Sequence, residues 1–488
     1  MELRVAHHSD SRVITTDIGV DANAKVARNV VGIGTAAYAA VLVAAAIISY
    51  RAYQMPRLDL GDMVQAVWSS AHGHLLEVTT GTGRQTPRLA AHVDPFLVLL
   101  VPFWWIWSSP LMLLLLQIAA VSVGAIPVYR LATKHTGSTR AGAHFALAYL
   151  LYPATQFNSL TVTTGMHAVS FAVPLILFAI WYLDNDRLVP FALFAVLAAS
   201  TKEEIGASVG CLGLWYAFRT RRWKVGLTTF ALGLSVTLVN VLVVIPHYSP
   251  SGVSPFAGRY GGIGATPGGA VHKLFSDPGA FVSTVASWHK ALYLALILMP
   301  FLGLWALEPL LLLGAVPDVA INLLSAKPEQ TTIDFHYTAG IVPFVVAAAI
   351  FGAARLRHRA EGLSLGCLVA VGCLSLLFSP ARLGFENLHL ARSTNAVHAA
   401  KTRALELIPD GVPVSASNQL GGYVSDRRFV YLYPVLGRAR WTIVDTRDPT
   451  YTDQAGYKTH AAALQDDPEW TTVYRAEGIE VLRRRELP

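Results

Sequence analysis

Residues 30–50 read VVGIGTAAYAAVLVAAAIISY, a stretch without a single charged side chain. A helix of about 20 apolar residues is long enough to cross the ~30 Å hydrocarbon core of a bilayer. The preceding segment, 1–29, is polar, and no small-residue cleavage pattern stands out after the apolar stretch. Because a secretory signal has its short apolar core near the N-terminus and a cleavage site behind it, we expect a retained first membrane helix.

The rest of the chain has the same apolar character. Hydrophobic residues occupy 53% of the 488 positions and charged residues 14%, whereas soluble proteins average about 25% charged residues. The mean hydropathy is +0.45. The composition predicts a mainly α-helical, polytopic membrane protein. We expect eleven spanning helices, at residues 30–50, 111–131, 141–157, 168–183, 188–201, 205–218, 225–245, 291–307, 309–324, 338–354 and 363–380.

One further apolar stretch, at residues 95–107, is not counted as a span. Apolar runs of about 10–14 residues are more typical of interfacial or re-entrant segments than of spanning helices. Trp104, Trp105 and Trp107 fit the aromatic belt at a membrane surface. We therefore expect this stretch to lie at the interface, inside a large first outer loop at residues 51–110.

The distribution of basic residues predicts the orientation. Lys and Arg are concentrated in the segments assigned to the inner side, at residues 1–29, 132–140, 184–187, 219–224 and 355–362. They are sparser in the longer outer segments. Because cytoplasmic loops are enriched in Lys and Arg, we expect a cytoplasmic N-terminal tail at residues 1–29 in a bacterial inner membrane. Eleven spans then place the C-terminus outside. The net charge of +7 has no basic run behind it and does not indicate nucleic acid binding.

The character of the chain changes after the membrane domain at residues 30–380. Charged residues of both signs become frequent from residue 381 onward. We expect a small, soluble, extracytoplasmic α/β domain at residues 381–488. Its predicted elements are a helix capped by Ser393 or Thr394 and running to Ile408, and strands at residues 412–416, 429–433, 441–445 and 478–482.

Two carboxylates open the first outer loop. Leu60, Met63, Val64 and Val67 recur at helical spacing, which predicts an amphipathic helix lying on the membrane. Asp59 would begin this helix, where a carboxylate can serve either as an N-cap or as a functional group. We assign Asp62 a structural role, because an acidic residue in the first turn is favoured by the helix dipole.

Other polar residues map to the same outer side. Lys202, Glu203 and Glu204 stand between two apolar runs, and ionisable groups at membrane depth normally pair or line a polar cavity. A short exposed turn is the alternative for this triplet. His92 precedes the interfacial stretch, where a histidine is often only an interfacial polar residue, and His336 opens the tenth helix. Arg259 belongs to a Gly-, Ser- and Pro-rich loop at residues 249–269, which we interpret as a possible lid.

The sequence resembles a known bacterial family of uncharacterised polytopic membrane proteins. The resemblance covers roughly residues 50–450. It rests on the order and spacing of several short blocks: DLG at 59–61, QAVW at 65–68, AHG at 71–73, His92 before LLVPFWWIWSSP, KEE at 202–204, His336-Tyr337 before IVPF, and SASN at 415–418 leading to Tyr433-Pro434.

That family is similar to the GT-C glycosyltransferases, which take sugars from polyprenyl-phosphate donors at the outer membrane face. The resemblance implies a GT-C-like fold and places the essential acidic residue of the first outer loop on Asp59. Many such enzymes have an adjacent acidic pair there, whereas this chain has Asp59 and Asp62. The resemblance also leaves open whether a divalent metal ion is bound, with Asp59 and Asp62 as candidate ligands.

The resemblance and the residues together lead to one functional hypothesis. A polyprenyl-phosphate-linked sugar would enter from the bilayer, with its phosphate near Lys202, His336 or Arg259, and His92, Glu203 and Glu204 would complete the binding site. Asp59 would take the proton of an extracytoplasmic acceptor hydroxyl. The alternative is a transporter or flippase of an anionic lipid-linked substrate, for which the sequence shows no inverted repeat. A scaffold protein would leave the charged cluster unexplained.

Overall fold

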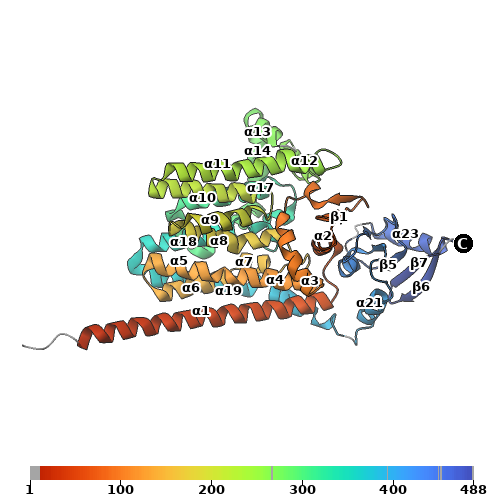
Figure 1. Ribbon diagram of the computed structural model, residues 1–488, viewed down its shortest axis with the longest axis horizontal. Helices are drawn as coiled ribbons and strands as arrows, with labels where there is room; N and C mark the ends of the chain where they lie inside the picture. The colour runs from red at the N-terminus through yellow and green to blue at the C-terminus, as the bar shows by residue number, and fades with distance from the viewer. Residues whose placement is uncertain (1–10, 265–266, 393, 449, 451–452, 486–488) are drawn as a thin grey trace, which may run out of the picture.

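The computed structural model describes residues 11–485, except 265–266, 393, 449 and 451–452. It consists of a helical bundle with a small sheet region packed at one end (Figure 1). The long helix α1 (Ser11–Arg51) runs along the bundle and ends beside that sheet region. It begins well before residue 30, so that much of the expected tail at residues 1–29 is helical; residues 1–10 lie outside the described part of the chain.

Each predicted span coincides with helical structure. The helices, in chain order, are α4 (Pro110–Val123), α5 (Ala125–Thr136), α6 (Thr139–Leu151), α7 (Pro153–Ser159), α8 (Ala172–Asp184), α9 (Leu188–Ala199), α10 (Ile205–Thr220), α11 (Trp223–Val239), α12 (Ile245–Tyr248), α13 (Pro267–Ser276), α14 (Pro278–Val285), α15 (Trp288–Leu298), α16 (Pro309–Leu312), α17 (Val316–Leu324), α18 (Val342–Arg355), α19 (Ala360–Leu377) and α20 (Pro380–Glu386). Four helical stretches in the described part are long and apolar enough to cross a membrane: Ala22–Arg51, Pro110–Thr136, Trp223–Tyr248 and Arg357–His389. The number eleven therefore stays a prediction.

Several predicted spans are interrupted for local reasons. A Cβ on Gly124 would lie 2.3 Å from the hydroxyl of Tyr149, and that hydroxyl donates to the carbonyl of Val121 at 2.7 Å. The bound carbonyl and the missing side chain allow the kink between α4 and α5. Pro153 divides the third span in the same way, because proline cannot donate the backbone hydrogen bond that would continue α6.

Helices α10 and α11 pack closely through glycines. A Cβ added to Gly213 would lie 2.3 Å from the carbonyl oxygen of Gly226, and one on Gly206 would lie 2.8 Å from that of Gly233. Small residues let helix backbones approach each other, which is a common basis of helix association in membranes. This contact fixes the start of α10 and with it the Lys202–Glu204 segment.

The first outer loop folds into compact structure between the bundle and the sheet region. Its elements are η1 (Arg57–Gly61), α2 (Asp62–Ala71), β1 (Glu77–Thr79), β2 (Gln85–Pro87), η2 (Arg88–Ala90), η3 (Pro95–Leu100) and α3 (Val101–Ile106). The expectation of a helix lying on the membrane is wrong for α2. Its Met63, Val64 and Val67 are buried, but so are Gln65 and Ser69 on other faces, because α2 packs against α3, β1 and η3.

The stretch at residues 95–107 forms two short helices, and its tryptophans differ in exposure. Trp105 is 68% exposed and Trp107 46%, as an aromatic belt requires, whereas Trp104 is only 1% exposed. Trp104 therefore belongs to the protein core. The one-sided placement of these rings fits a segment that lies along the bundle with one face outward.

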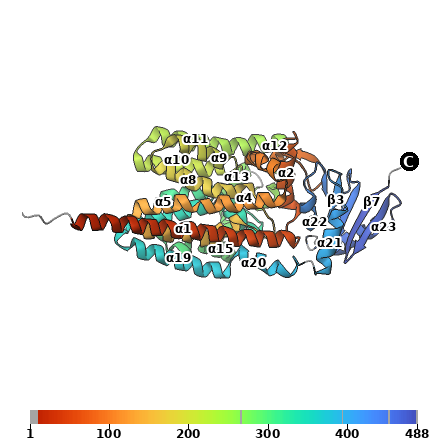
Figure 2. The same ribbon diagram turned by 60° about the horizontal axis from the view of Figure 1, so that its bottom comes forward.

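A five-stranded sheet, with strands in the order β4-β3-β5-β7-β6, forms the C-terminal region. Figure 2 shows its strands β3 and β7 beyond the end of the bundle. Strand β3 (Val414–Ala416) is parallel to β4 (Val430–Leu432) and β5 (Trp441–Asp445), and β7 (Ile479–Arg484) is antiparallel to β5 and β6 (Trp470–Ala476). Helices α21 (Ala396–Glu406), α22 (Asn418–Gly421) and α23 (Gln454–Asp466) pack with it.

The four predicted strands are present, and the sequence reasoning missed β6 and α23. The predicted cap of the first helix is wrong, since the side chain of Asn395 accepts from the backbone N–H groups of Val397 and His398 at 3.0 and 3.3 Å. Asn395 lies one residue beyond Thr394, and Ser393 lies outside the described residues.

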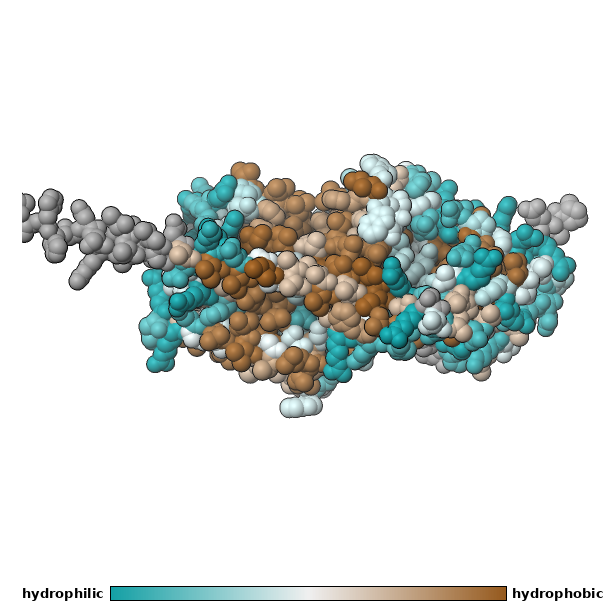
Figure 3. All heavy atoms as spheres, turned by 90° about the horizontal axis from the view of Figure 1, so that it is seen from below, coloured by the Kyte–Doolittle hydropathy of each residue, from teal (hydrophilic) through white to brown (hydrophobic). Residues whose placement is uncertain are grey.

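The surface carries the signature of a membrane protein. In Figure 3 a hydrophobic band covers the middle of the bundle, and hydrophilic residues gather at both of its ends and over the C-terminal region. Exposed apolar side chains from several helices, such as Val196, Leu232, Val369 and Leu376, are 57–79% exposed. Such a contiguous belt is stable only against lipid.

Candidate functional site

Asp59 lies in a strained turn at the end of the bundle that faces the sheet region. Its backbone φ is +86° and ψ is −90°, values that residues with a side chain rarely adopt. Such strain costs on the order of 1–3 kcal/mol and persists only where the surroundings enforce it. The turn precedes α2, so that Asp59 does not begin that helix as expected. Its side chain remains 44% exposed.

Two stacked histidines lie behind the Asp59 carboxylate. The Nε2 atom of His167 is 3.5 Å from Oδ1 of Asp59. The ring of His167 stacks on that of His336, with centroids 3.6 Å apart and an interplanar angle of 20°. Among the described residues, neither Nδ1 of His167 nor Nδ1 of His336 has a hydrogen-bond partner. Because buried polar atoms normally find partners, these nitrogens indicate a site for a polar ligand.

The surrounding charges set the protonation of this group. Burial by itself would raise the pKa of Asp59, but His167, Lys327 and Arg88 together lower it below its ordinary value. Burial is the largest cause that lowers the pKa of His336 well below its ordinary value, and nearby basic groups, including His167 and Lys202, add to the effect. At neutral pH the site thus pairs an ionised Asp59 with a neutral His336.

Asp62 is occupied by an ion pair. Its Oδ1 atom lies 3.1 Å from Nη1 of Arg57, a residue whose side chain is 1% exposed. Among the residues that the structure describes, no group of three or more His, Cys, Asp or Glu side chains is arranged to hold a metal ion. Asp59 and Asp62 as metal ligands therefore stay a prediction that the resemblance leaves open.

Two side-chain contacts, Arg88–Asp94 and His92–Glu203, hold the second half of the first outer loop in place. Arg88 Nε lies 2.6 Å from Oδ2 of Asp94, and both side chains are buried. Asp94 is the N-cap residue of η3, but its side chain makes no capping hydrogen bond and pairs with Arg88 instead. His92 Nδ1 lies 3.0 Å from Oε1 of Glu203, whose Oε2 accepts from the backbone N–H of Val93 at 3.1 Å.

The Lys202–Glu204 segment lies at the break between α9 and α10. Lys202 Nζ and Glu204 Oε1 are 2.5 Å apart, with side chains 16% and 6% exposed. A short exposed turn does not describe this segment. The backbone N–H of Phe96 donates to the carbonyl of Ser200 at 3.0 Å, so the segment meets the first outer loop at the same end of the bundle.

The loop that carries Arg259 folds over the His92–Glu203 pair. The ring of Phe256 stacks on His92 with centroids 4.6 Å apart, and the Arg259 guanidinium lies 4.2 Å from the centre of the same ring. The carbonyl of Arg259 accepts from the backbone N–H of Ala326 at 2.8 Å, next to Lys327. All the residues predicted from the sequence thus gather at one end of the bundle.

Three basic residues of this cluster were not predicted as site residues from the sequence: Arg88, His167 and Lys327. His167 begins the fourth predicted helix, where a histidine can either bond within the helix end or join the polar residues on the outer side. Lys327 is the single Lys or Arg of the segment 325–337, which is predicted to be outer, and that isolation was the available signal. Neither Lys327 nor Arg259 has a carboxylate within ion-pair distance in the described part of the chain, in contrast to Lys202 and Arg88.

Residues of the C-terminal region form hydrogen bonds with the turn that contains Asp59. Nε of Arg57 donates to the carbonyl of Val430 at 3.0 Å, and the backbone N–H of Leu58 donates to Oδ1 of Asn418 at 2.9 Å. The Gln65 amide donates to the carbonyl of Arg428 at 2.7 Å. Two contacts directly before Asp59 therefore come from a distant part of the chain, and they explain how the strained turn is maintained.

One family match covers residues 51–481, which includes the first outer loop, the bundle and almost all of the sheet region. The chain belongs to the family described as Predicted membrane protein (DUF2079). This match confirms the predicted membrane class and the resemblance to a family of polytopic membrane proteins. No curated protein matches the chain.

Two solved structures resemble this DUF2079 protein over most of its length. ArnT from Cupriavidus metallidurans bound to undecaprenyl phosphate superposes with a TM-score of 0.51 at 12% sequence identity, covering 91% of this chain and 97% of ArnT. The apo state of the same ArnT gives a TM-score of 0.51 at 13% identity, with coverage of 91% and 96%. The predicted GT-C-like fold with a small C-terminal sheet is thus confirmed.

Proposed function

We propose that this DUF2079 protein transfers a sugar from a polyprenyl-phosphate donor to an acceptor on the extracytoplasmic side of the inner membrane. The observation that carries the proposal is Asp59, whose backbone is strained and whose carboxylate is partly exposed and lies 3.5 Å from His167. Lys327 and Arg88 also lower the pKa of this carboxylate. The ArnT structure of the same fold contains undecaprenyl phosphate, a ligand of the proposed donor class.

Asp59 is the base of the proposed reaction. The oxygen of the acceptor hydroxyl attacks the anomeric carbon, the bond from that carbon to the lipid phosphate breaks, and the hydroxyl proton passes to Asp59. A base must be ionised to accept a proton, and the lowered pKa of Asp59 keeps it ionised at neutral pH. His167 orients the carboxylate from behind.

Arg259 and Lys327 are the proposed partners of the donor phosphate. Neither has a carboxylate partner among the described residues, so both can stabilise the charge that develops on the leaving phosphate, while the charge of Lys202 is largely offset by Glu204. His336, which is neutral, contributes a hydrogen bond rather than a charge. In this proposal His92, Glu203 and Glu204 position the first outer loop and the Arg259 loop around the substrate.

The proposed orientation places this cluster outside, as the distribution of basic residues predicts. The other end of the bundle carries Arg219, Arg222, Arg355 and Arg357, in agreement with an inner surface rich in positive charge. A lipid-linked donor would then reach Asp59 laterally from the outer leaflet.

The decisive experiment uses purified protein in vesicles that contain a radiolabelled polyprenyl-phosphate sugar. Transfer of label from the lipid to a water-soluble or lipid acceptor supports the proposal. If the donor stays intact while a labelled lipid crosses from one leaflet to the other, the flippase alternative replaces it. Since sugar and acceptor are unidentified, the donor panel should include pentose, hexose and amino-sugar forms.

A further inference from the structure

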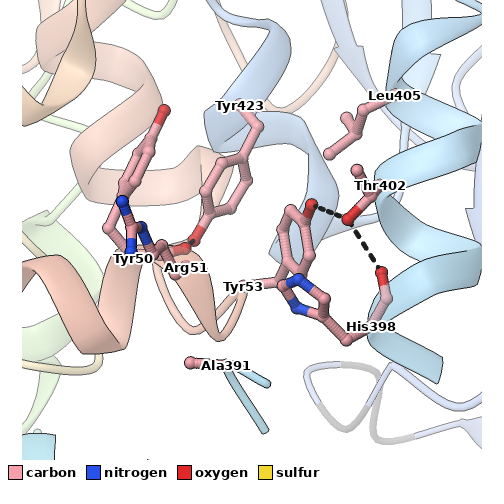
Figure 4. Close-up of a pocket in the computed structure, with 8 residues that line it drawn as sticks. All are labelled: Tyr50, Arg51, Tyr53, Ala391, His398, Thr402, Leu405 and Tyr423. Carbon is pink, nitrogen blue, oxygen red and sulfur yellow. Dashed lines mark hydrogen bonds between the residues drawn. The ribbon is translucent and has the colours of Figure 1, made fainter. Parts of the chain in front are cut away.

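A hollow lies between the end of α1 and the C-terminal region (Figure 4). Its volume is about 580 Å³, within the range of small-molecule sites. None of the residues assigned to the donor site lines it. The lining residues are Tyr50, Arg51, Tyr53, Ala391, His398, Thr402, Leu405 and Tyr423.

Aromatic rings form the wall of this pocket. The ring centroids of Tyr50 and Tyr423 are 4.7 Å apart, those of Tyr53 and Tyr423 are 5.0 Å apart, and those of Tyr53 and His398 are 5.2 Å apart. Tyr53 is held at φ +56°, a conformation that side-chain-bearing residues adopt infrequently, and its hydroxyl is 2.7 Å from that of Thr402. The wall is therefore a fixed surface.

The end of α1 presents a positive charge to the pocket. The carbonyls of Ile48, Ser49 and Tyr50, which would otherwise repel an anion, accept hydrogen bonds from the following turn, and that of Tyr50 accepts a further one from the Tyr423 hydroxyl at 2.7 Å. The Arg51 side chain is exposed, and no ion-pair partner is found for it in the described part of the chain. A guanidinium in this state matches a phosphate group.

One buried polar atom of the pocket lacks a partner. Nδ1 of His398 is buried and makes no hydrogen bond among the described residues. Figure 4 shows His398 beside Tyr53, on the α21 side of the pocket, with Arg51 on the α1 side. A ligand with a hydroxyl group near His398 and an anionic group near Arg51 would satisfy both.

We propose that this pocket binds a phosphodiester headgroup that carries hydroxyl groups, such as a glycerol- or sugar-bearing phosphate of the outer leaflet. Arg51 binds the phosphate, His398 binds a hydroxyl, and the tyrosine rings contact the C–H groups between them. Arg51 ends the long apolar stretch Ala22–Arg51, which places the pocket at the edge of the bilayer. The inference goes beyond the proposed sugar transfer and does not depend on it.

Membrane anchoring alone does not account for this arrangement. Tyrosines that only anchor a protein at an interface turn their rings toward lipid headgroups. Tyr53 is 9% exposed and packs against α21 and Tyr423, and the unpartnered His398 nitrogen is enclosed. Anchoring needs neither the enclosed histidine nor the strained tyrosine, whereas a headgroup site uses both.

The test measures lipid binding by the full-length protein. Phosphatidylglycerol is titrated against protein purified in detergent with phosphatidylcholine, and native mass spectrometry reports the bound lipid. The wild type should bind phosphatidylglycerol in preference to phosphatidylcholine. Arg51→Gln should weaken that binding about tenfold or more, since a charged hydrogen bond is lost, and His398→Phe should weaken it by a smaller factor. Arg84→Gln, in an exposed turn of the first outer loop, is the matched control.

A soluble ligand is distinguished by titrating glycerol 1-phosphate and following thermal unfolding. Stabilisation of the wild type, but not of Arg51→Gln, would keep the phosphate site and identify its source as soluble. Equal binding of both lipids together with no response to glycerol 1-phosphate would overturn the proposal. So would equal losses in Arg51→Gln and Arg84→Gln. Circular dichroism shows whether each variant is folded, and His398→Phe repeats the test should Arg51→Gln fail to fold.

Discussion

Nε2 of His167 lies 3.5 Å from Oδ1 of Asp59, and the same imidazole stacks on His336 at a centroid distance of 3.6 Å. This arrangement joins three parts of the chain: the first outer loop, the segment before α8 and the segment before α18. It acts on the pKa of Asp59, because His167 is the foremost of the groups that lower this pKa.

His167→Gln should therefore change the pH dependence of sugar transfer. Without the imidazole, the pKa of Asp59 rises, and a larger share of the carboxylate is protonated in mild acid. Because only the ionised carboxylate acts as a base, the acidic limb of the kcat/KM profile should move to higher pH. The exposed His460→Gln serves as the control. An acidic limb that stays in place or moves to lower pH would contradict the assignment.

Lys327→Gln tests the proposed phosphate contact. The ammonium, which has no carboxylate partner among the described residues, should interact with the phosphate of the donor, so its loss should raise the KM for the donor about tenfold or more. Lys458→Gln, on the exposed face of α23, should leave the KM unchanged. The measurement is initial transfer rate against donor density in vesicles. An unaltered donor KM in a folded Lys327→Gln protein would remove Lys327 from the site.

The bundle could be predicted from the sequence because its signals are local. Apolar runs such as residues 205–218 and 363–380 coincide with α10 and α19 to within a few residues, since helix formation in a membrane satisfies every backbone group within the segment. The breaks were harder to predict. The kink at Gly124 depends on the hydroxyl of Tyr149, which belongs to the separate helix α6 and which no local pattern reports.

Part of the site could also be predicted, because some of its residues have local signals in the sequence. The Lys202–Glu204 triplet stands out as charges among apolar residues, which a single sequence makes visible. The role of Asp59 was predicted from the family resemblance of its sequence block. The reversed backbone of Asp59 depends on Asn418 and Val430, which contact its neighbours from a distant part of the chain. Lys327 is a candidate because the structure shows no carboxylate within ion-pair distance of it among the described residues, which the sequence does not reveal.

Gly213→Ala should destabilise the bundle. The new Cβ would lie 2.3 Å from the carbonyl of Gly226, so α10 and α11 must move apart at a cost of about 1–3 kcal/mol. Gly372→Ala in α19 is the control, because nothing lies within 4 Å of its added Cβ and helix propensity improves. Thermal unfolding in detergent reports both. A Gly213→Ala protein as stable as the Gly372→Ala protein would contradict the close packing.

The orientation can be tested with single cysteines in a cysteine-free background. We predict Arg221 inside and both Gly268 and the C-terminal region outside, from the distribution of Lys and Arg. Asn418 is predicted to be outside but is only 4% exposed, so His460 is the better probe of that region. An impermeant thiol reagent should label positions 268 and 460 of intact spheroplasts and should reach 221 only after lysis. The reverse pattern would overturn the topology.

Asp59 itself provides the sharpest test of the proposed reaction. Asp59→Asn keeps the size of the side chain but removes its charge and most of its basicity, so transfer should fall by about 10²–10⁴-fold. Asp62→Asn should reduce transfer less, because Asp62 pairs with Arg57 rather than facing His167. Asp59→Gly adds an independent measurement. Glycine tolerates the backbone at φ +86°, so this variant should unfold at a higher temperature than the wild type while losing transfer. That combination would show that the strain is kept for activity. Normal transfer by a folded Asp59→Asn protein would falsify the general-base assignment, and loss of donor binding with unchanged turnover would make Asp59 a donor ligand instead.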